Sequence, residues 1–287
     1  MSNKIGIIGA GKVGCSVGKY LAQGGNTIVG YASKSLDSAK FAAEFVDTRA
    51  FDSVQMLLSE CNIIFITTSD AAISEVWKEI IVNDIEGKIF CHFSGSLSSE
   101  LFAGRKEKGA YACSIHPMYA FSDKMNSYKG MGKVSFTVEG DKVAQDVVGG
   151  IFSRLGNKIN IIRPETKIRY HAAASVVSNM MIGLYQMGVD MLIDCGFDEK
   201  SARELIEPLV KNNIDNMLST SPVEALTGPI ERNDIGTVIK HIECLGKTEK
   251  NAYLSLAEKL VEISKKKNPD RDYSEMEKIV NRRGINV

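Results

Sequence analysis

The stretch Ile5-Gly6-Ile7-Ile8-Gly9-Ala10-Gly11-Lys12-Val13-Gly14 decides the fold, because a short apolar run leads directly into the spacing G-x-G-x-x-G. This pattern predicts a strand, a tight turn and a helix whose first N–H groups favour an anion. A glycine-rich turn without a ligand is the alternative, but the position between a strand and a helix favours a dinucleotide's pyrophosphate. The expected contacts are Gly9, Gly11, Lys12, Val13 and Gly14.

The second apolar run, Thr27–Tyr31, indicates which dinucleotide is bound. NAD-binding proteins usually carry an acid at the end of this strand, where it holds the ribose hydroxyls. Here the run is followed by Ala32, Ser33 and Lys34. A hydroxyl and a cation suit a 2′-phosphate, so we expect NADP(H) with Ser33 and Lys34 as contacts. The alternative is that both are ordinary polar loop residues.

Short apolar runs alternate with amphipathic segments through the first half of the chain. This alternation is typical of β-α-β units with a parallel sheet. We therefore expect an α/β fold with a doubly wound Rossmann-type parallel sheet. The further expected strands are Ile63–Thr67, Lys88–Phe93, Ala110–Ile115, Val134–Val138 and Lys158–Ile162. The expected helices are Val13–Gln23, Ser35–Phe45, Ala71–Val82, Ser98–Lys108 and Val143–Leu155.

The pattern changes at Arg163-Pro164, after which only helices are predicted. We expect a dinucleotide-binding domain at 1–163 and an all-α domain for substrate binding and dimerisation at 164–287. Its first helix, Glu165–Cys195, includes a membrane-like stretch from Ala172 to Ile193. Several polar residues interrupt that stretch, so we interpret it as a buried core helix.

The composition limits the classes of partner. The 287 residues include 35 Lys and Arg against 35 Asp and Glu, a net charge of +0. Balanced charge argues against a nucleic-acid partner or an acidic membrane surface. The six cysteines contain no C-x-x-C pair, which predicts a reduced, cytoplasmic chain without a metal site.

Polar residues follow three of the expected strands, where ligands bind in doubly wound sheets. Thr68 and Ser69 follow the expected strand Ile63–Thr67, and Ser94-Gly95-Ser96 follow the strand Lys88–Phe93. His116 directly follows the strand Ala110–Ile115. We expect them to hold the nicotinamide end and a substrate carboxylate, although ordinary loop chemistry explains Ser94 and His116 equally well. Capping of the next helix is sufficient to explain Asp70.

Four polar residues at spacings of four, namely Lys167, His171, Ser175 and Asn179, form a stripe on the long helix. Each step of four residues turns an α-helix by about 40°, so the stripe drifts slowly around the surface. Buried polar groups need partners. The stripe therefore pairs with another helix or, as we favour, lines a ligand cleft between the domains.

Several motifs resemble those of a family that joins a Rossmann-like domain to a helical domain long labelled as of unknown function. The matching residues are Tyr170-His171-Ala172-Ala173-Ala174 with Ser178-Asn179, Glu224-Ala225-Leu226-Thr227-Gly228-Pro229 with Arg232 and Asp234, Ser94-Gly95-Ser96, and Ser114-Ile115-His116-Pro117. The resemblance covers nearly the whole chain. It includes PanG-type ketopantoate reductases, and it implies an NADPH-linked reductase that is a homodimer through the helical domain.

Two positions depart from the family pattern. Asn233 stands where relatives have glycine between Arg232 and Asp234, so a tight turn there requires a backbone that Asn tolerates less freely. Ser175 stands where better-known ketopantoate reductases carry a lysine. The lysine's role therefore does not transfer to this chain.

The favoured hypothesis is NADPH-dependent reduction of a small 2-oxo acid, best assigned as ketopantoate to pantoate. We expect Ser94, Gly95, Ser96, His116, Ser175 and Thr227 to bind the substrate and Asn179 to hydrogen-bond its carbonyl oxygen or carboxylate. His171 is the expected proton donor, with Lys167 and His116 as rivals. The alternatives are an imine or pyrroline-carboxylate-type reductase and a non-catalytic NADP(H)-binding protein.

Overall fold

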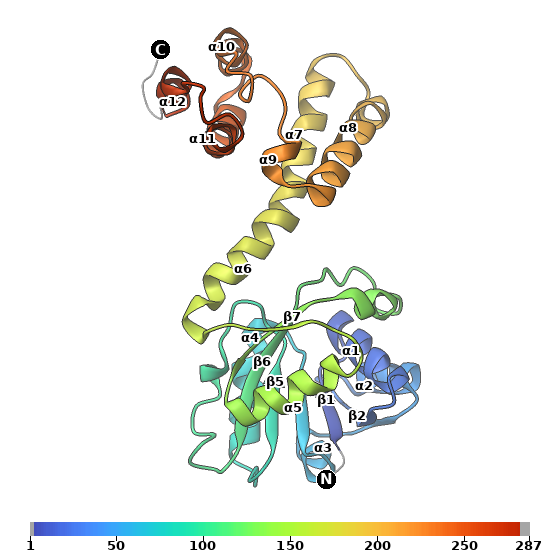
Figure 1. The fold of residues 1–287 in the computed structure, drawn as a ribbon. Helices are drawn as coiled ribbons and strands as arrows, with labels where there is room; N and C mark the ends of the chain where they lie inside the picture. The colour runs from blue at the N-terminus through green and yellow to red at the C-terminus, as the bar shows by residue number, and fades with distance from the viewer. Residues whose placement is uncertain (1–2, 282–287) are drawn as a thin grey trace. The chain divides into compact units, whose positions relative to one another are not determined.

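The computed structural model describes residues 3–281 and divides into two compact units, one ending at Ser178 and the other starting at Asn179. The first unit contains one eight-stranded sheet in the order β3-β2-β1-β4-β5-β6-β7-β8 (Figure 1). Neighbours from β3 to β6 are parallel, β7 is antiparallel to β6, and β8 is parallel to β7. The strands are β1 (Lys4–Ile8), β2 (Thr27–Ala32), β3 (Arg49–Ala50), β4 (Ile63–Ile66), β5 (Ile89–His92), β6 (Tyr111–Pro117), β7 (Phe136–Gly140) and β8 (Ile159–Ile161).

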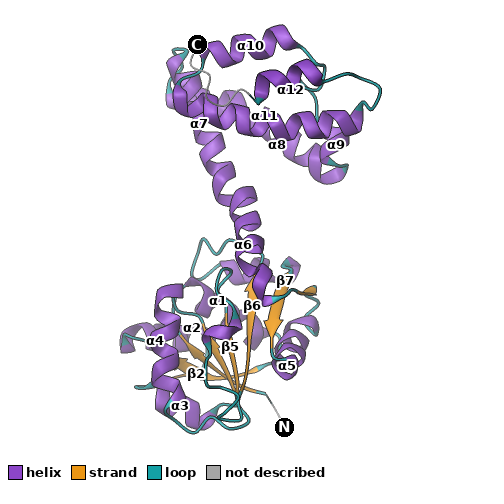
Figure 2. Cartoon of the chain, turned by 90° about the vertical axis from the view of Figure 1, so that its left-hand side faces the viewer, coloured by secondary structure: helices purple, strands orange, loops and turns teal. Residues whose placement is uncertain are grey.

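Both faces of the sheet are covered, which is why β4 and β5 are apolar at nearly every position. Ile5 and Ile7 of β1 point to one face, where α1, α2 and α5 pack. Ile8 points to the other face, where α3 and α4 pack. The orange strands lie between purple helices in Figure 2. These helices are α1 (Lys12–Gln23), α2 (Leu36–Val46), α3 (Val54–Glu60), α4 (Asp70–Ile81) and α5 (Lys142–Ser153).

The fold class predicted from the sequence is confirmed, with two local differences. The helix expected at Ser98–Lys108 is wrong, because only a 3₁₀ turn at Ser99–Leu101 forms, followed by further turns. Gly104 and Gly109 have φ of +78° and +66° there, values that interrupt a right-handed helix. The two-residue edge strand β3 and the short helix α3 had no strong periodic signal and were not expected.

The described residues of the second unit, 179–281, form helices joined by loops and turns, without a strand. Its core joins α10, α11 and α12 through apolar side chains that include Val238, Leu254 and Met276. The domain boundary expected after residue 163 stays a prediction; the last strand ends at Ile161 and helical structure begins at Pro164. The helices are α7 (Met181–Asp194), α8 (Glu199–Ser219), α9 (Pro222–Ala225), α10 (Ile235–Cys244), α11 (Lys247–Lys267) and α12 (Ser274–Val280).

The long helical run from Pro164 to Asp194 differs from the expected buried core helix. It comprises a 3₁₀ turn, α6 (Lys167–Ser175), a π-helical segment at Val176–Met180 and α7. By length and apolar content it could span a membrane, yet only 6% of its most apolar window is buried within this chain. The expected burial is therefore wrong for a single copy of the chain. The π segment also ends the regular α-helical spacing assumed for the polar stripe, because its hydrogen bonds are i→i+5.

The turn around Asn233 has the left-handed backbone that its motif position required, with φ of +61°. The side chain compensates for the missing glycine, since Asn233 Nδ2 donates to the Asp272 carbonyl at 3.0 Å. Asp234 caps α10 by accepting from the Thr237 N–H and hydroxyl. The motif thus builds a fixed turn at the start of α10.

Candidate functional site

The turn between β1 and α1 fits a bound diphosphate. Gly9 has φ of +108°, and a Cβ on Gly14 would overlap the Gly9 carbonyl oxygen, so glycine is required at both positions. Gly11 has no atom within 4 Å of the place where its Cβ would stand. No side chain caps α1. The first-turn N–H groups therefore face open space above Gly11, as anion binding requires.

Thr67, directly after β4, fixes this turn; the sequence places it in a polar strand end without giving it a role. Its hydroxyl group donates to two carbonyl oxygens, that of Ile8 at 3.2 Å and that of Gly9 at 3.0 Å. The neighbouring Thr68 hydroxyl is buried and has no hydrogen-bond partner in the described part of the chain. A buried hydroxyl without a partner suits a site that a ligand completes. Ser69 follows as the N-cap residue of α4.

The end of β2 places Ser33 and Lys34 immediately before α2. Lys34 is exposed and Ser33 is half-buried. Tyr31 anchors the strand to the phosphate turn, because its buried hydroxyl donates to the Gly14 carbonyl at 3.0 Å. Ser35 caps α2 by accepting from the Ser38 N–H. Ser33 and Lys34 therefore directly follow a strand that is tied to the phosphate turn, and their contact with a 2′-phosphate stays a prediction.

The loop after β5 is organised around one carboxylate. Asp70 Oδ2 accepts from the Ser94 hydroxyl at 2.7 Å and from the Ser96 hydroxyl at 2.9 Å. Ser94 Oγ in turn accepts from the N–H groups of Ser96 and Leu97. Asp70 therefore does more than start α4. It places a negative charge beside the two serines that were expected to bind substrate.

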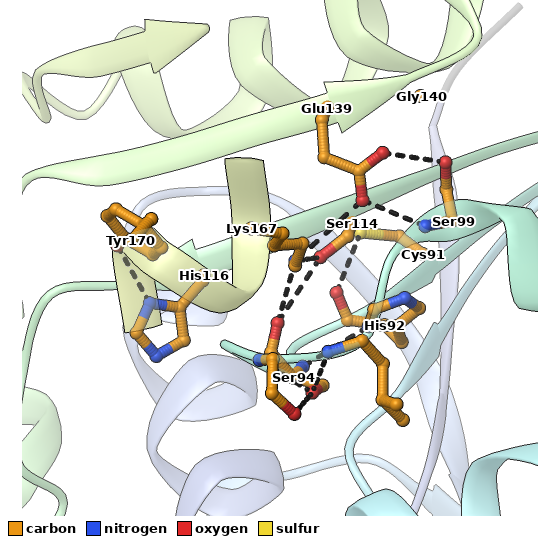
Figure 3. A network of polar contacts seen from close by, with 12 residues as sticks. Cys91, His92, Ser94, Ser99, Ser114, His116, Glu139, Gly140, Lys167 and Tyr170 are labelled. Atoms are coloured by element: carbon orange, nitrogen blue, oxygen red, sulfur yellow. Dashed lines mark hydrogen bonds and ion pairs between the residues drawn. The ribbon is translucent and has the colours of Figure 1, made fainter. Parts of the chain in front are cut away.

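Lys167 is buried, with 1% of its surface exposed, and lies within a polar network (Figure 3). Its ammonium group donates to the Ser94 carbonyl at 2.8 Å and to the Ser114 hydroxyl. Glu139 of β7 is also buried, and its carboxylate lies 3.7 Å from the ammonium group. Burial lowers the pKa of Lys167, while Glu139 opposes that shift. These contacts attach the ammonium group to the loop after β5, to β6 and to β7, and its role as a proton donor stays a prediction.

Glu139 joins the same network to the Ser99 turn. Its carboxylate accepts from the Ser99 N–H and hydroxyl, both at 2.8 Å. His92 at the end of β5 is fully buried, and its Nδ1 accepts from the Ser94 N–H at 3.2 Å. Burial is the main cause that lowers the His92 pKa to about 3, so its ring is neutral. The loop that carries Ser94 is therefore fixed from both sides.

His116 and His171 converge on Gly95. Their rings are perpendicular, with centroids 5.8 Å apart. A Cβ on Gly95 would overlap His171 Nδ1 and lie 2.8 Å from His116 Nε2. Tyr170, next to His171 on α6, has its hydroxyl 2.8 Å from His116 Nδ1. Burial, with contributions from Lys167 and His171, lowers the His116 pKa to about 4.

The remaining expected residues lie farther along the chain. Ser175 is the last residue of α6 and half-buried, and Asn179 is exposed on the π segment. Thr227 belongs to a loop whose neighbours Glu224 and Leu226 accept hydrogen bonds from Lys267 through their carbonyl oxygens. The first unit thus brings together the phosphate turn, the serine loop and the two histidines at the carboxyl ends of its strands. The roles of Asn179 and Thr227 stay predictions.

Sequence reasoning missed Thr67, Glu139 and Tyr170 as organisers of this site. Glu139 had a signal, because a carboxylate in an otherwise apolar strand requires a buried partner. Tyr170 had a signal as well, because it directly precedes His171 in a motif that carries the family resemblance. Among residues 3–281, no group of three or more His, Cys, Asp and Glu side chains is arranged to hold a metal ion.

Two family models match successive parts of the chain. Residues 2–117 match the Rossmann-like domain, and residues 134–260 match the domain of unknown function DUF2520. The second match starts before β7, so it includes the strand that carries Glu139 as well as the helices. A search of curated proteins gave no match.

Solved structures share the fold over nearly the whole chain. A protein from Thermotoga maritima is 23% identical with a TM-score of 0.72, and 91% of this chain aligns with 98% of that one. A Bacteroides fragilis protein with the provisional name NADP oxidoreductase is 22% identical with a TM-score of 0.68 and the same coverage, 91% and 98%. Pyrroline carboxylate reductase from Plasmodium falciparum, solved with NADP bound, is 16% identical with a TM-score of 0.58. In that comparison 93% of this chain aligns with 97% of the other.

Replacing Lys167 by Met tests the buried network. The change leaves the Glu139 carboxylate buried without its cation, so we expect a loss of about 3–5 kcal/mol in the free energy of unfolding, measured by urea denaturation. Lys142→Met is the matched control, because the Lys142–Asp146 pair is exposed and should contribute less than about 1 kcal/mol. Equal losses in the two variants would contradict a structural role for Lys167.

Proposed function

We propose that this protein is an NADPH-dependent reductase of a small carbonyl or imine substrate. The observation that carries the proposal is the convergence, within one compact unit, of a phosphate-binding turn and a histidine pair at the same edge of the sheet. Ligands of doubly wound sheets bind at this edge. The NADP-bound structure among the similar folds supports the choice of coenzyme.

The residues present fit the coenzyme. Gly9, Gly11, Lys12, Val13 and Gly14 would hold its pyrophosphate, with Thr68 and Ser69 beside the turn. Ser33 and Lys34 would hold the 2′-phosphate. When bound, the reduced coenzyme supplies a hydride for the substrate.

Lys34→Ala should weaken NADPH binding selectively. A charge-assisted contact of about 1.4 kcal/mol corresponds to a roughly tenfold higher Kd for NADPH, whereas NADH, which lacks the 2′-phosphate, should bind with unchanged affinity. Calorimetric titration of the full-length protein measures both constants. Lys40→Ala is the control on the exposed face of α2. Equal effects on NADPH and NADH would remove Lys34 from this role, and no binding of either coenzyme would refute the proposed function.

His171 is the proposed proton donor. Its ring lies beside the Ser94–Ser96 loop, and its Nδ1 is buried without a hydrogen-bond partner among the described residues. Protonated His171 would stabilise the negative charge that develops on the substrate oxygen as hydride reaches carbon, and transfer of that proton leaves a neutral imidazole. In this proposal Asn179 and Thr227 contact the substrate, and Lys167 positions the loop.

The substrate best supported by the family resemblance is a 2-oxo acid, specifically ketopantoate. One feature favours the second candidate, a C=N substrate. The Asp70 carboxylate accepts from both Ser94 and Ser96, so a substrate carboxylate placed there would be repelled, whereas an iminium cation would be attracted.

His171→Ala should lower kcat by roughly 10²- to 10⁴-fold while NADPH binding persists, because the proton donor is lost and the phosphate turn is intact. A panel of 2-oxo acids, including ketopantoate, and cyclic imines, followed by NADPH absorbance, measures the effect and identifies the substrate class. The variant Asp70→Asn distinguishes the two substrate classes. Because it removes the negative charge, it should raise activity on anionic 2-oxo acids relative to activity on iminium ions. NADPH binding without oxidation by any compound would indicate a non-catalytic binding protein.

We also propose that a second copy of the chain covers the exposed apolar helix. Val177 and Ile182 are 68% and 67% exposed on the run from Pro164 to Asp194. The run also contains Ser175, Asn179 and Asp190, polar groups that a protein interface accommodates better than lipid. A homodimer is the simplest association that buries these side chains.

Light scattering should give twice the monomer mass for the purified protein, and Ile182→Glu should shift it to monomer. Val82→Glu, at an exposed site at the end of α4, is the control and should leave the mass unchanged. A monomeric wild-type protein, or a dimer unaffected by Ile182→Glu, would contradict an interface on this helix.

A further inference from the structure

The loop between β6 and β7 lies against the helices that flank the proposed coenzyme site. It spans residues 118–135 and includes a 3₁₀ segment, Ser127–Lys133, that packs on α1 (Figure 1). Tyr128 of this segment meets Phe45 of α2 edge to face, with ring centroids 5.9 Å apart. The loop therefore contacts the two helices that begin at the phosphate turn and at the end of β2.

Lys124 occupies the part of this loop that lies between the phosphate turn and α2. Its ammonium group is 4.3 Å from the ring centroid of Phe41, an exposed side chain of α2. The same charge acts on Cys15 in the first turn of α1, since burial raises the pKa of that thiol and Lys124 opposes the shift. The Cys15 thiol donates back to the Ala10 carbonyl within the phosphate turn, at 3.6 Å. Lys124 is therefore close to both structures that would hold the coenzyme.

The residue before Lys124 holds the loop in this place. Asp123 Oδ1 accepts from the N–H groups of Met125 and Asn126, at 2.7 and 2.6 Å. These N–H groups are the main cause that lowers the Asp123 pKa, and Lys12 at the start of α1 contributes to the same shift. The backbone that carries Lys124 is thus folded around a carboxylate near the first residue of α1.

Lys124 differs from nearby lysines in its lack of a partner for its charge. Among residues 3–281 its ammonium group, on a half-buried side chain, has neither a hydrogen bond nor an ion pair. Lys129 of the same loop donates to Asn126 Oδ1, and Lys19 of α1 donates to the Phe45 carbonyl, both at 2.8 Å. A cation that is held over an aromatic ring without an anion is available to an anionic ligand.

The 2′-phosphate of NADPH is an anion that one cation does not balance. A phosphate monoester carries a charge of about −1.5 to −2 at neutral pH. Lys34 offers one positive charge at the end of β2, while Asp37 in the first turn of α2 is itself acidic. The Ser35 hydroxyl is already used to cap that helix. A second cation beside α2 would therefore strengthen the binding of this phosphate.

We propose that Lys124 is a second cationic contact for the 2′-phosphate, acting together with Lys34 to select NADPH over NADH. This inference rests on the proposed function, in which the coenzyme binds at the phosphate turn. Phe41 is a positioning residue, because its ring holds the ammonium group beside α2. The pyrophosphate is the less favoured ligand, since the first-turn N–H groups of α1 supply its donors.

Calorimetric titration of the full-length protein with NADPH and with NADH tests this contact. Lys124→Met removes the charge and keeps most of the side chain, so the Kd for NADPH should rise roughly tenfold while that for NADH is unchanged. Lys124→Arg keeps a charge that also stacks on aromatic rings, so it should bind NADPH more tightly than Lys124→Met does. Lys129→Met is the matched control, because it removes an exposed charge from the same loop; both constants should equal those of the wild type.

Phe41→Leu provides a second variant if Lys124→Met does not fold, since it removes the ring from an exposed position. The Kd for NADPH alone should then rise roughly two- to fivefold, because the ammonium group loses the ring that positions it.

Three results would overturn the contact: an unchanged Kd for NADPH in the variant, an equal rise for NADPH and NADH, or a loss in Lys124→Arg as large as in Lys124→Met. The wild-type titration separates this failure from that of the proposed function. A wild-type protein that binds neither coenzyme refutes the reductase. A wild-type protein that binds NADPH no better than Lys124→Met does refutes only the role of Lys124.

Discussion

The buried ion pair between Lys167 and Glu139 is the constraint on which the rest of the site depends. The Lys167 ammonium group joins the start of α6 to the loop after β5 and to the middle of β6, and the Glu139 carboxylate adds β7 and the Ser99 turn. Such a pair is costly to desolvate, and it persists only because the remaining polar atoms are also satisfied. Tyr170 and His171 follow on the same helix, so this attachment also positions Tyr170 against His116 and His171 against Gly95.

The pair also sets the electrostatics of the strand ends. A buried cation disfavours further positive charge nearby, and together with desolvation this keeps His116 neutral. Asp70 provides an exposed negative charge on the other side of the serine loop. Lys167, His116 and Asp70 thus place a cation, a neutral imidazole and a carboxylate near the loop that carries Ser94.

The sequence predicted the parts of this arrangement that depend on local pattern. The apolar runs, the glycine spacing and the helices beyond Pro164 follow from periodicity and backbone geometry, and the structure confirms them. Contacts between residues distant in the chain could not be predicted in the same way. Lys167 was expected to be a rival proton donor, because it lies one turn before His171 and has a flexible reach. That role stays a prediction, but its burial against Glu139 and Ser114, which come from two other strands, could not be predicted from its position on the helix. The π segment likewise cannot be predicted from a four-residue spacing that assumes a regular α-helix.

The space above Gly95 has a consequence for how this protein can vary. The backbone there is not left-handed; glycine is favoured because a Cβ would lie 2.4 Å from His171 Nδ1 and 2.8 Å from His116 Nε2, so both rings would have to shift. Every amino-acid replacement reachable from a glycine codon by a single nucleotide change adds at least that methyl carbon. Any replacement of Gly95 therefore displaces both imidazoles at once, whereas the neighbouring loop residues can change without that displacement.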